Sequence, residues 1–211
     1  DVLVRVFTGA RVSLAIGLLS AMLSVALGTM VGGVGGYVGG WVDASLMRVT
    51  DAMLAVPRLP FLMIVAAILQ PSIALLIVLV GVAGWMETAR VVRAEVLSLA
   101  QRGFVEAARA AGVTRWRILA GHILPNATGT LAVSATLAVG RGILLESALS
   151  FFGVGVQPPA ASWGNMLYQA QTTLTSEPWL AIFPGMAIFA TVLCVNVVGE
   201  HLAGWGGPER A

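Results

Sequence analysis

Long uncharged stretches separated by short polar segments dominate the pattern of this chain. No charged residue lies between Arg11 and Asp43, and a second uncharged run, Leu59 to Met86, is interrupted only by a polar turn at residues 70–72. A helix that crosses a membrane needs about 20 mainly apolar residues. The pattern therefore predicts five spans, at about residues 12–38, 46–69, 73–89, 127–151 and 179–199. The second is the least regular of the five, because it contains charged residues and prolines.

Composition agrees with this pattern. Hydrophobic residues make up 58% of the 211 residues, charged residues only 10%, and the mean hydropathy is +0.90. A soluble domain has about a quarter of its residues charged. We therefore expect an all-α polytopic membrane protein whose surface is solvated mostly by lipid.

The placement of the arginines predicts the orientation, because short cytoplasmic loops carry an excess of positive charge. Six arginines lie between the third and fourth predicted spans: Arg90, Arg93, Arg102, Arg109, Arg115 and Arg117. Loop 90–126 is then cytoplasmic, as is the tail 201–211, whereas segment 1–11 and loop 152–178 are external. Arg5 and Arg11 violate the rule. An odd number of spans with an external N-terminus leads us to expect another helix before Asp1.

Several kinds of chemistry are disfavoured. All twelve basic residues are arginine, so the lysine of a Walker A phosphate-binding loop is missing. The net charge of +2 is too small to suggest nucleic acid. Cys194 is the only cysteine, and His122 and His201 are not spaced as zinc ligands. We predict no metal site, no cofactor and no catalytic residue in this chain.

Glycine recurs at every fourth position near the end of the first span. Residues at this spacing lie along one slowly drifting stripe of a helix, and small residues allow helices to approach closely in lipid. We predict a packing face within this chain or against a second membrane subunit. A nucleotide-binding glycine loop is the weaker alternative, because no strand precedes these residues. The stripe consists of Gly28, Gly32, Gly36 and Gly40.

Three polar residues fall at membrane depth: Arg141 and Glu146 in the fourth span and Asn196 in the fifth. A charge there costs about 2.5–3.5 kcal/mol on insertion scales, so each should face protein or water. Arg141 and Glu146 do not share a helix face, and each needs a partner on another helix. They form either the wall of a translocation pathway or buried structural contacts. We expect Arg58 to extend to the membrane interface, and Glu146 to be the only acid within the membrane.

The arginine-bearing segment 102–126 predicts an elbow of two short helices. Strong helix formers from Phe104 to Ala111 are followed by Gly112, which breaks the run, and a second helix is predicted at residues 115–120. The small side chains of Ala107 and Ala108 beside Glu106 predict a patch that fits a cleft in a partner. The alternative is a basic helix resting on anionic lipid.

Two motifs carry a resemblance to a known family. The sequence EAARAAG at 106–112, with ILP at 123–125, resembles the EAA signature of ATP-binding-cassette (ABC) importer permeases, although His122 stands where the family spacing places isoleucine. The sequence LSFFGVGVQPPAASWGNML at 149–167 resembles the external loop of the dipeptide, oligopeptide and nickel permease subfamily. The opening DVLVRVFTGARVSL at residues 1–14 is also similar to this subfamily, so the resemblance covers essentially the whole chain.

The resemblance implies a type I importer fold in which the first of six spans is absent from this sequence. It implies a bacterial or archaeal cell membrane, a second homologous permease, two ABC ATPases that bind ATP and magnesium, and an extracytoplasmic substrate-binding protein. Glu106, Ala107, Ala108 and Gly112 would then transmit movement from the ATPases. The external loop would face the binding protein or roof the cavity through Gln157, Pro158, Pro159, Trp163, Gly164 and Asn165.

Three functions stay open on the sequence. A permease subunit of an ATP-driven importer of di- and oligopeptides explains both motifs. A secondary transporter or channel driven by an ion gradient would need connected acids or histidines within the membrane, preferably with internal repeats. A membrane scaffold would explain the elbow but not the external loop.

Overall fold

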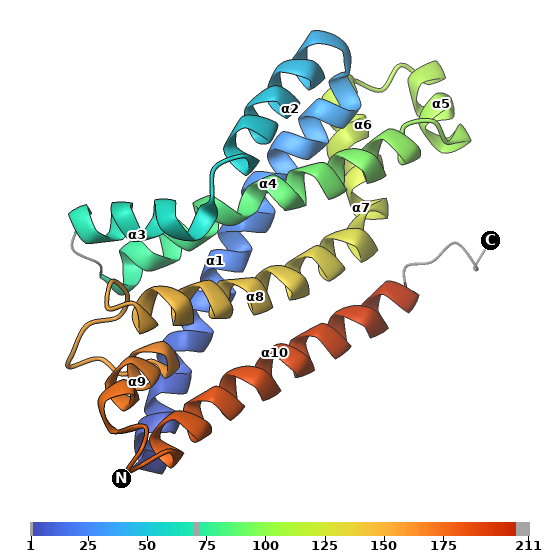
Figure 1. Cartoon of the computed structure of the whole chain (residues 1–211). Helices are drawn as coiled ribbons and strands as arrows, with labels where there is room; N and C mark the ends of the chain where they lie inside the picture. Colours follow the sequence, from blue (N-terminus) through green and yellow to red (C-terminus); the bar gives the residue numbers. More distant parts are fainter. Residues whose placement is uncertain (1, 70–71, 206–211) are drawn as a thin grey trace.

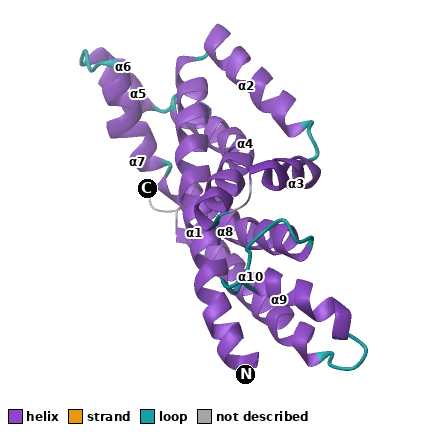
Figure 2. Ribbon diagram, turned by 90° about the vertical axis from the view of Figure 1, so that its left-hand side faces the viewer, coloured by secondary structure: helices purple, strands orange, loops and turns teal. Residues whose placement is uncertain are grey.

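The structure, a computed structural model, describes residues 2–69 and 72–205, and every regular element in these residues is helical. Figures 1 and 2 show a bundle of long helices with short helices at its two ends. The α-helices are α1 (Val2–Val38), α2 (Gly40–Leu54), α3 (Arg58–Leu69), α4 (Ile73–Leu99), α5 (Gly103–Ala110), α6 (Arg115–Ile118), α7 (Leu124–Asn126), α8 (Thr128–Phe151), α9 (Trp163–Ala170) and α10 (Trp179–Trp205). A π-helical turn, η1 (Leu119–Ile123), joins α6 to α7, and a 3₁₀ turn, η2 (Gln171–Thr173), follows α9.

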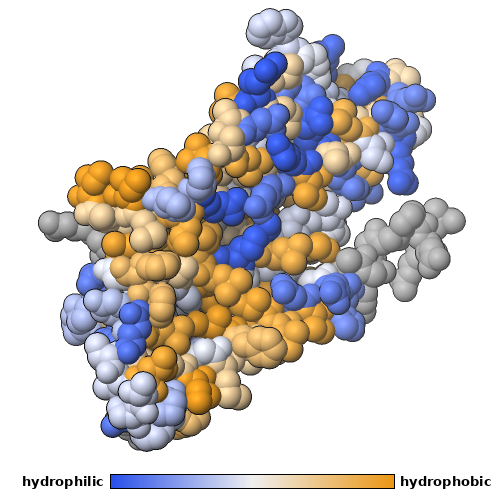
Figure 3. Space-filling model, viewed as in Figure 1, coloured by the Kyte–Doolittle hydropathy of each residue, from blue (hydrophilic) through white to orange (hydrophobic). Residues whose placement is uncertain are grey.

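Four of these helices, α1, α4, α8 and α10, are long and apolar enough to cross a membrane, and the bent pair α2–α3 passes the same test as a fifth segment. This agrees with the five predicted spans. Figure 3 shows a hydrophobic band across the middle of this face of the molecule, and hydrophilic residues gather at the two ends of the molecule.

Helix α1 runs the full length of the bundle (Figure 1). Its 37 residues span about 55 Å at 1.5 Å per residue, against a hydrocarbon core of about 30 Å. The predicted external segment 1–11 is therefore not separate, because from Val2 onward it is helical and continuous with the span. As a result α1 contacts elements at both ends of the bundle.

The glycine stripe brings α1 against α4. A Cβ added at Gly28 would lie 2.6 Å from the Cβ of Thr88, and one added at Gly36 would lie 2.8 Å from the carbonyl oxygen of Arg93. At Gly32 it would collide with the carbonyl oxygen of Ala89. These three glycines thus form a packing face within the chain. Gly40 does not belong to it, because α1 ends at Val38 and a Cβ on Gly40 meets nothing within 4 Å.

The second predicted span is broken into α2 and α3, whose axes differ by 79°. Pro57 lies in the break and explains it, because a proline disfavours helical backbone in the residue before it and is tolerated at a helix start. At its other end α2 follows Gly39, which has a φ of 69°. Two ion pairs hold α2 against α4: Arg93 binds both carboxylate oxygens of Asp43 at 2.5 and 2.6 Å, and Arg90 binds Asp51 at 2.6 Å.

The connecting segments are more helical than predicted. Helix α4 continues to Leu99, so about a quarter of the predicted loop 90–126 is in fact the end of a long helix. Loop 152–178 contains α9 and η2, and α10 continues to Trp205 into the predicted tail. The remainder of that tail, residues 206–211, lies outside the described residues.

Candidate functional site

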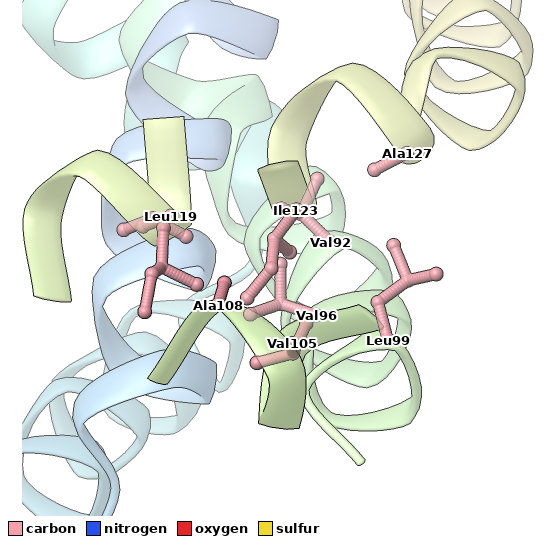
Figure 4. Close-up of a cluster of buried hydrophobic side chains, with 9 residues drawn as sticks. Val92, Val96, Leu99, Val105, Ala108, Leu119, Ile123 and Ala127 are labelled. Carbon is pink, nitrogen blue, oxygen red and sulfur yellow. The ribbon is translucent and has the colours of Figure 1, made fainter. Parts of the chain in front are cut away.

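Helix α5 is the outer arm of an elbow at one end of the bundle. Its inner face contributes Val105 and Ala108 to a buried apolar cluster with Val92 and Val96 of α4 and with Ile123 (Figure 4). At 100° per residue, the opposite face carries Glu106, Ala107 and Ala110, which are all exposed. Ala108 therefore belongs to the core and not to the predicted surface patch, and the exposed small residues are Ala107 and Ala110.

The elbow turns at Gly112, whose φ of 76° lies in the left-handed region. The N–H of Gly112 donates to the carbonyl of Arg109 at 3.0 Å, and the N–H of Val113 donates to that of Ala108 at 3.1 Å. This pair of bonds is the Schellman motif that ends many helices, with glycine at its left-handed position. Val113 also packs against the apolar cluster. The glycine thus fixes the angle at which α5 stands on the bundle.

Two contacts tie the elbow to the long helices. The guanidinium of Arg109 lies 5.7 Å from the ring centroid of Tyr37, near the end of α1, within the range of a cation–π interaction. The turn η1 continues through α7 into α8 and buries Ile123 completely, whereas His122 is half-buried. The elbow is therefore in contact with α1 and is joined to α8.

At the opposite end, α9 folds back onto α1 and α8 (Figures 1 and 2). Glu146 of α8 is fully buried there and accepts hydrogen bonds from the hydroxyls of Ser13 at 2.9 Å and Ser150 at 2.7 Å. Ser13 in turn accepts the backbone N–H of Trp163 at 3.1 Å, and Ser150 accepts that of Val156. In this structure Glu146 therefore makes a buried contact that seats the 152–178 segment, the second of the two predicted alternatives.

The predicted external-loop residues separate into two groups. Trp163, Gly164 and Asn165 are buried, and Trp163 also donates from its indole N–H to the carbonyl of Val6 at 3.1 Å. Asn165 donates to the carbonyl of Val156 at 2.8 Å. These three hold the loop in place and cannot contact a partner. The exposed group is Gln157, Pro158 and Pro159.

A cluster of three charges lies near the middle of the bundle. Glu87 of α4 accepts from Arg58 of α3 at 2.9 Å through one carboxylate oxygen, and its other oxygen accepts from Arg141 of α8. Asn196 is half-buried on α10 and faces Gly140, where an added Cβ would lie 3.6 Å from its side-chain oxygen. No hydrogen bond in the described part of the chain joins Asn196 to this cluster.

Sequence reasoning missed Glu87 and misplaced Arg58. Glu87 was expected near the end of a span that finished at residue 89, but α4 continues for ten more residues and places it well inside the helix. Glu146 is thus not the only acid at membrane depth. Arg58 does not extend to the interface, because it pairs with Glu87. The signal was present, since an arginine and an acid in neighbouring apolar helices favour each other as partners.

The cluster borders a cavity of about 670 Å³ in the angle between the α2–α3 bend and α4. Arg58 and Glu87 are its charged lining residues, and the remaining lining is apolar, including Phe61, Val82 and Met86. Cavities of about 300–1,000 Å³ with apolar walls and a few polar groups are typical of small-molecule sites.

The chain is similar to proteins of one family along its whole length. A family model described as binding-protein-dependent transport system inner membrane component matches residues 6–205. The oligopeptide transport system permease protein OppC of Salmonella typhimurium is 43% identical over 202 residues, which cover 96% of this chain and 67% of that protein. A putative peptide permease protein of Brucella ovis is 41% identical over 204 residues, which cover 96% and 68%. A solved structure of the MetNI methionine ABC transporter, in inward-facing conformations, has a chain with a TM-score of 0.76 at 20% identity over 94% of both chains. That last likeness shows the fold.

Proposed function

The chain belongs to the family of binding-protein-dependent transport system inner membrane components, and from this premise we propose that it is the permease subunit of an ATP-driven peptide importer. It is a multi-pass inner membrane protein. The relatives named as oligopeptide and peptide permeases support peptides as the solute. ATP hydrolysis is the task of separate ATPase subunits.

The observation that carries the proposal is the shape of the elbow. Ala107 and Ala110 present small side chains outward, while Val105 and Ala108 anchor α5 to a cluster shared with α4 and η1. A small-surfaced helix can enter a cleft of a partner, and a rigid base allows it to transmit the partner's movement. On this proposal the elbow docks on an ATPase. Glu106 supplies a charge at the contact, and Gly112 fixes the angle between α5 and the next helix.

The assembly would contain a second homologous permease, two ATPases that hold ATP and magnesium, and a binding protein that delivers the solute from outside. The elbow end and the C-terminus would then lie in the cytoplasm of a bacterial or archaeal cell. The exposed Gln157, Pro158 and Pro159 would face the binding protein at the other end. Movement of the elbow would shift α1, α4 and α8 and so switch the cavity between the two sides.

Ala107→Asp tests the docking surface. We expect the complex to assemble less tightly or to hydrolyse ATP without peptide uptake, because a carboxylate replaces a methyl group at the contact. The matched control is Ala44→Asp, the same change at an exposed alanine on α2 near the same end of the bundle. Uptake of a radiolabelled tripeptide and ATP hydrolysis are measured on the same vesicles. Normal coupled uptake by Ala107→Asp would show that α5 is not the ATPase contact.

A further inference from the structure

The cluster of Arg58, Glu87 and Arg141 has an unbalanced charge. Two guanidiniums share one carboxylate, which leaves a net charge of +1. The other ion pairs among the described residues join α2 to α4 and involve neither arginine. Each charge at mid-membrane costs about 2.5–3.5 kcal/mol on insertion scales. An uncompensated positive charge near the middle of α4 and α8 therefore calls for an anionic group from outside this set.

Both arginines also have unused hydrogen-bond donors. A guanidinium carries five N–H groups, yet among the described residues Arg58 finds an acceptor for one terminal nitrogen only, and Arg141 does the same. The two guanidiniums are like charges on either side of the shared carboxylate. A second carboxylate could accept from both forks, because paired N–H groups match the two oxygens of a carboxylate.

The cluster is accessible from the cavity. The side chains of Arg58, Glu87 and Arg141 are 23%, 36% and 39% exposed, and Figure 3 shows hydrophilic residues reaching into the hydrophobic band in the region between α4 and α8 of Figure 1. The cavity of about 670 Å³ has Arg58 and Glu87 at its edge and apolar walls elsewhere. Arg58 and Glu87 together are neutral, and Arg141, which binds the other oxygen of Glu87, gives the cluster beside this cavity its positive charge. An apolar cavity next to such a cluster suits a solute that has apolar side chains and one carboxylate.

A second crevice reaches the same arginines from the side of α1. Ser20 and Ser24 line it together with Arg58 and Arg141. The hydroxyl of Ser24 is buried and has no hydrogen-bond partner within the described part of the chain. Buried polar groups are rarely left unpaired, and the crevice has a volume of only about 10 Å³, so one water molecule beside the arginines would satisfy this hydroxyl.

We propose that Arg58, Glu87 and Arg141 form a relay site that receives the carboxylate of a peptide, its C-terminus above all, as the peptide crosses the membrane. The inference rests on the proposed function and deepens it by naming the group of the solute that this chain holds. Glu87 occupies the arginines in the solute's absence. It also competes with the solute carboxylate, so that binding stays weak enough for release.

The first arm of the test uses the wild-type importer, assembled with its partner subunits in vesicles without a membrane potential. Three probes are compared: trialanine, trialanine amide and N-acetyltrialanine. The binding protein's affinity for each is measured separately, and uptake rates are compared at equal occupancy. We expect trialanine and N-acetyltrialanine, which both keep the carboxylate, to enter at least about tenfold faster than the amide. This is the lower end of what a hydrogen bond to a charged group contributes.

The second arm uses Arg141→Gln. We expect the rate for the two carboxylate peptides to fall to that of the amide, while the rate for the amide stays unchanged. The matched control is Arg90→Gln, because Arg90 lies on α4 in an exposed ion pair outside the cluster. We expect this control to retain the preference for a carboxylate.

Each outcome separates the two proposals. Equal wild-type rates for trialanine and its amide, or an equal loss of both in Arg141→Gln, would overturn the relay site. The second result would assign the cluster to a structural contact or to an acidic side chain of the partner permease. In both cases the proposed function stands, because peptides still enter. If the wild-type complex hydrolyses ATP and moves none of the three peptides, the proposed function itself is wrong.

Discussion

Glu87 and Glu146 are the same chemical group on two of the long apolar helices, but their surroundings differ in every respect that matters. Glu146 is fully buried and accepts from two serine hydroxyls, which also hold the α9 segment through Trp163 and Val156. Glu87 is 36% exposed, lies between two arginines and borders a large cavity. The carboxylate of Glu146 is satisfied by neutral hydroxyl donors, whereas that of Glu87 lies in a cluster with a net positive charge beside an open cavity.

The difference shows that a position on a membrane-spanning helix does not by itself make a carboxylate functional. A closed network of hydrogen bonds rigidifies the elements that it joins, and at Glu146 these are α1, α8 and the 152–178 segment. A site that has unsatisfied hydrogen-bond donors and is open to a cavity can instead exchange one bound group for another. We therefore assign stability to Glu146 and solute handling to Glu87, and the following predictions test that division from the largest effect on stability to the smallest.

Glu146→Ala should have the largest effect, lowering the free energy of unfolding by about 3 kcal/mol or more, because buried hydroxyls lose their acceptor and a void remains. Unfolding in mixed micelles, followed by circular dichroism against the fraction of SDS, measures it. Glu146→Gln keeps one acceptor oxygen and should lose less than half as much. If Glu146→Ala were as stable as the wild type, Glu146 would have no role in stability, and its difference from Glu87 would not hold.

Gly164→Ala tests how tightly the Glu146 end is closed. A Cβ at Gly164 would lie 2.6 Å from the Cα and the carbonyl oxygen of Ser147. Because backbone atoms cannot move aside cheaply, we expect a loss of about 2 kcal/mol. The matched control is Gly185→Ala on α10, where a Cβ meets nothing within 4 Å, so this change should be neutral or stabilise the helix by up to about 1 kcal/mol. A neutral Gly164→Ala would mean that α9 is loosely seated.

Ser13→Ala separates the network from simple burial. Ser13 donates to Glu146 and accepts from the N–H of Trp163, so we expect a loss of about 1.5 kcal/mol. Ser20→Ala is the control, because Ser20 is equally buried on α1 but donates to the carbonyl of Gly17 within its own helix. It should cost under about 0.5 kcal/mol. Equal losses in the two variants would argue against a network centred on Glu146.

The sequence predicts the long helices well, because hydrophobic length is a local property. It also predicts the turn at Gly112, where one residue type fits a left-handed backbone. The partners of the polar residues cannot be predicted from a local pattern, because Ser13 and Glu146 are 133 positions apart and Arg141 and Glu87 are 54 apart. Their pairing depends on how α1, α4 and α8 cross. Burial of Ala108 and Trp163 was missed for the same reason, because a short segment between spans does not reveal which face it turns inward.

Glu87→Gln should have the smallest effect on stability and a large effect on transport. The side chains of this cluster are 23–39% exposed, so water in the cavity can solvate the two guanidiniums once the carboxylate is removed. Ion pairs in such places contribute about 0–1 kcal/mol, and we expect the free energy of unfolding to change by under about 1 kcal/mol. The arginines, freed from their competitor, should hold a peptide carboxylate longer. The maximal uptake rate of trialanine should therefore fall while that of trialanine amide stays the same. Asp51→Asn, which breaks the exposed pair with Arg90 on the same helix, is the matched control and should leave both rates unchanged. A large loss of stability in Glu87→Gln, with equal slowing of both peptides, would make Glu87 a second structural carboxylate and erase its difference from Glu146.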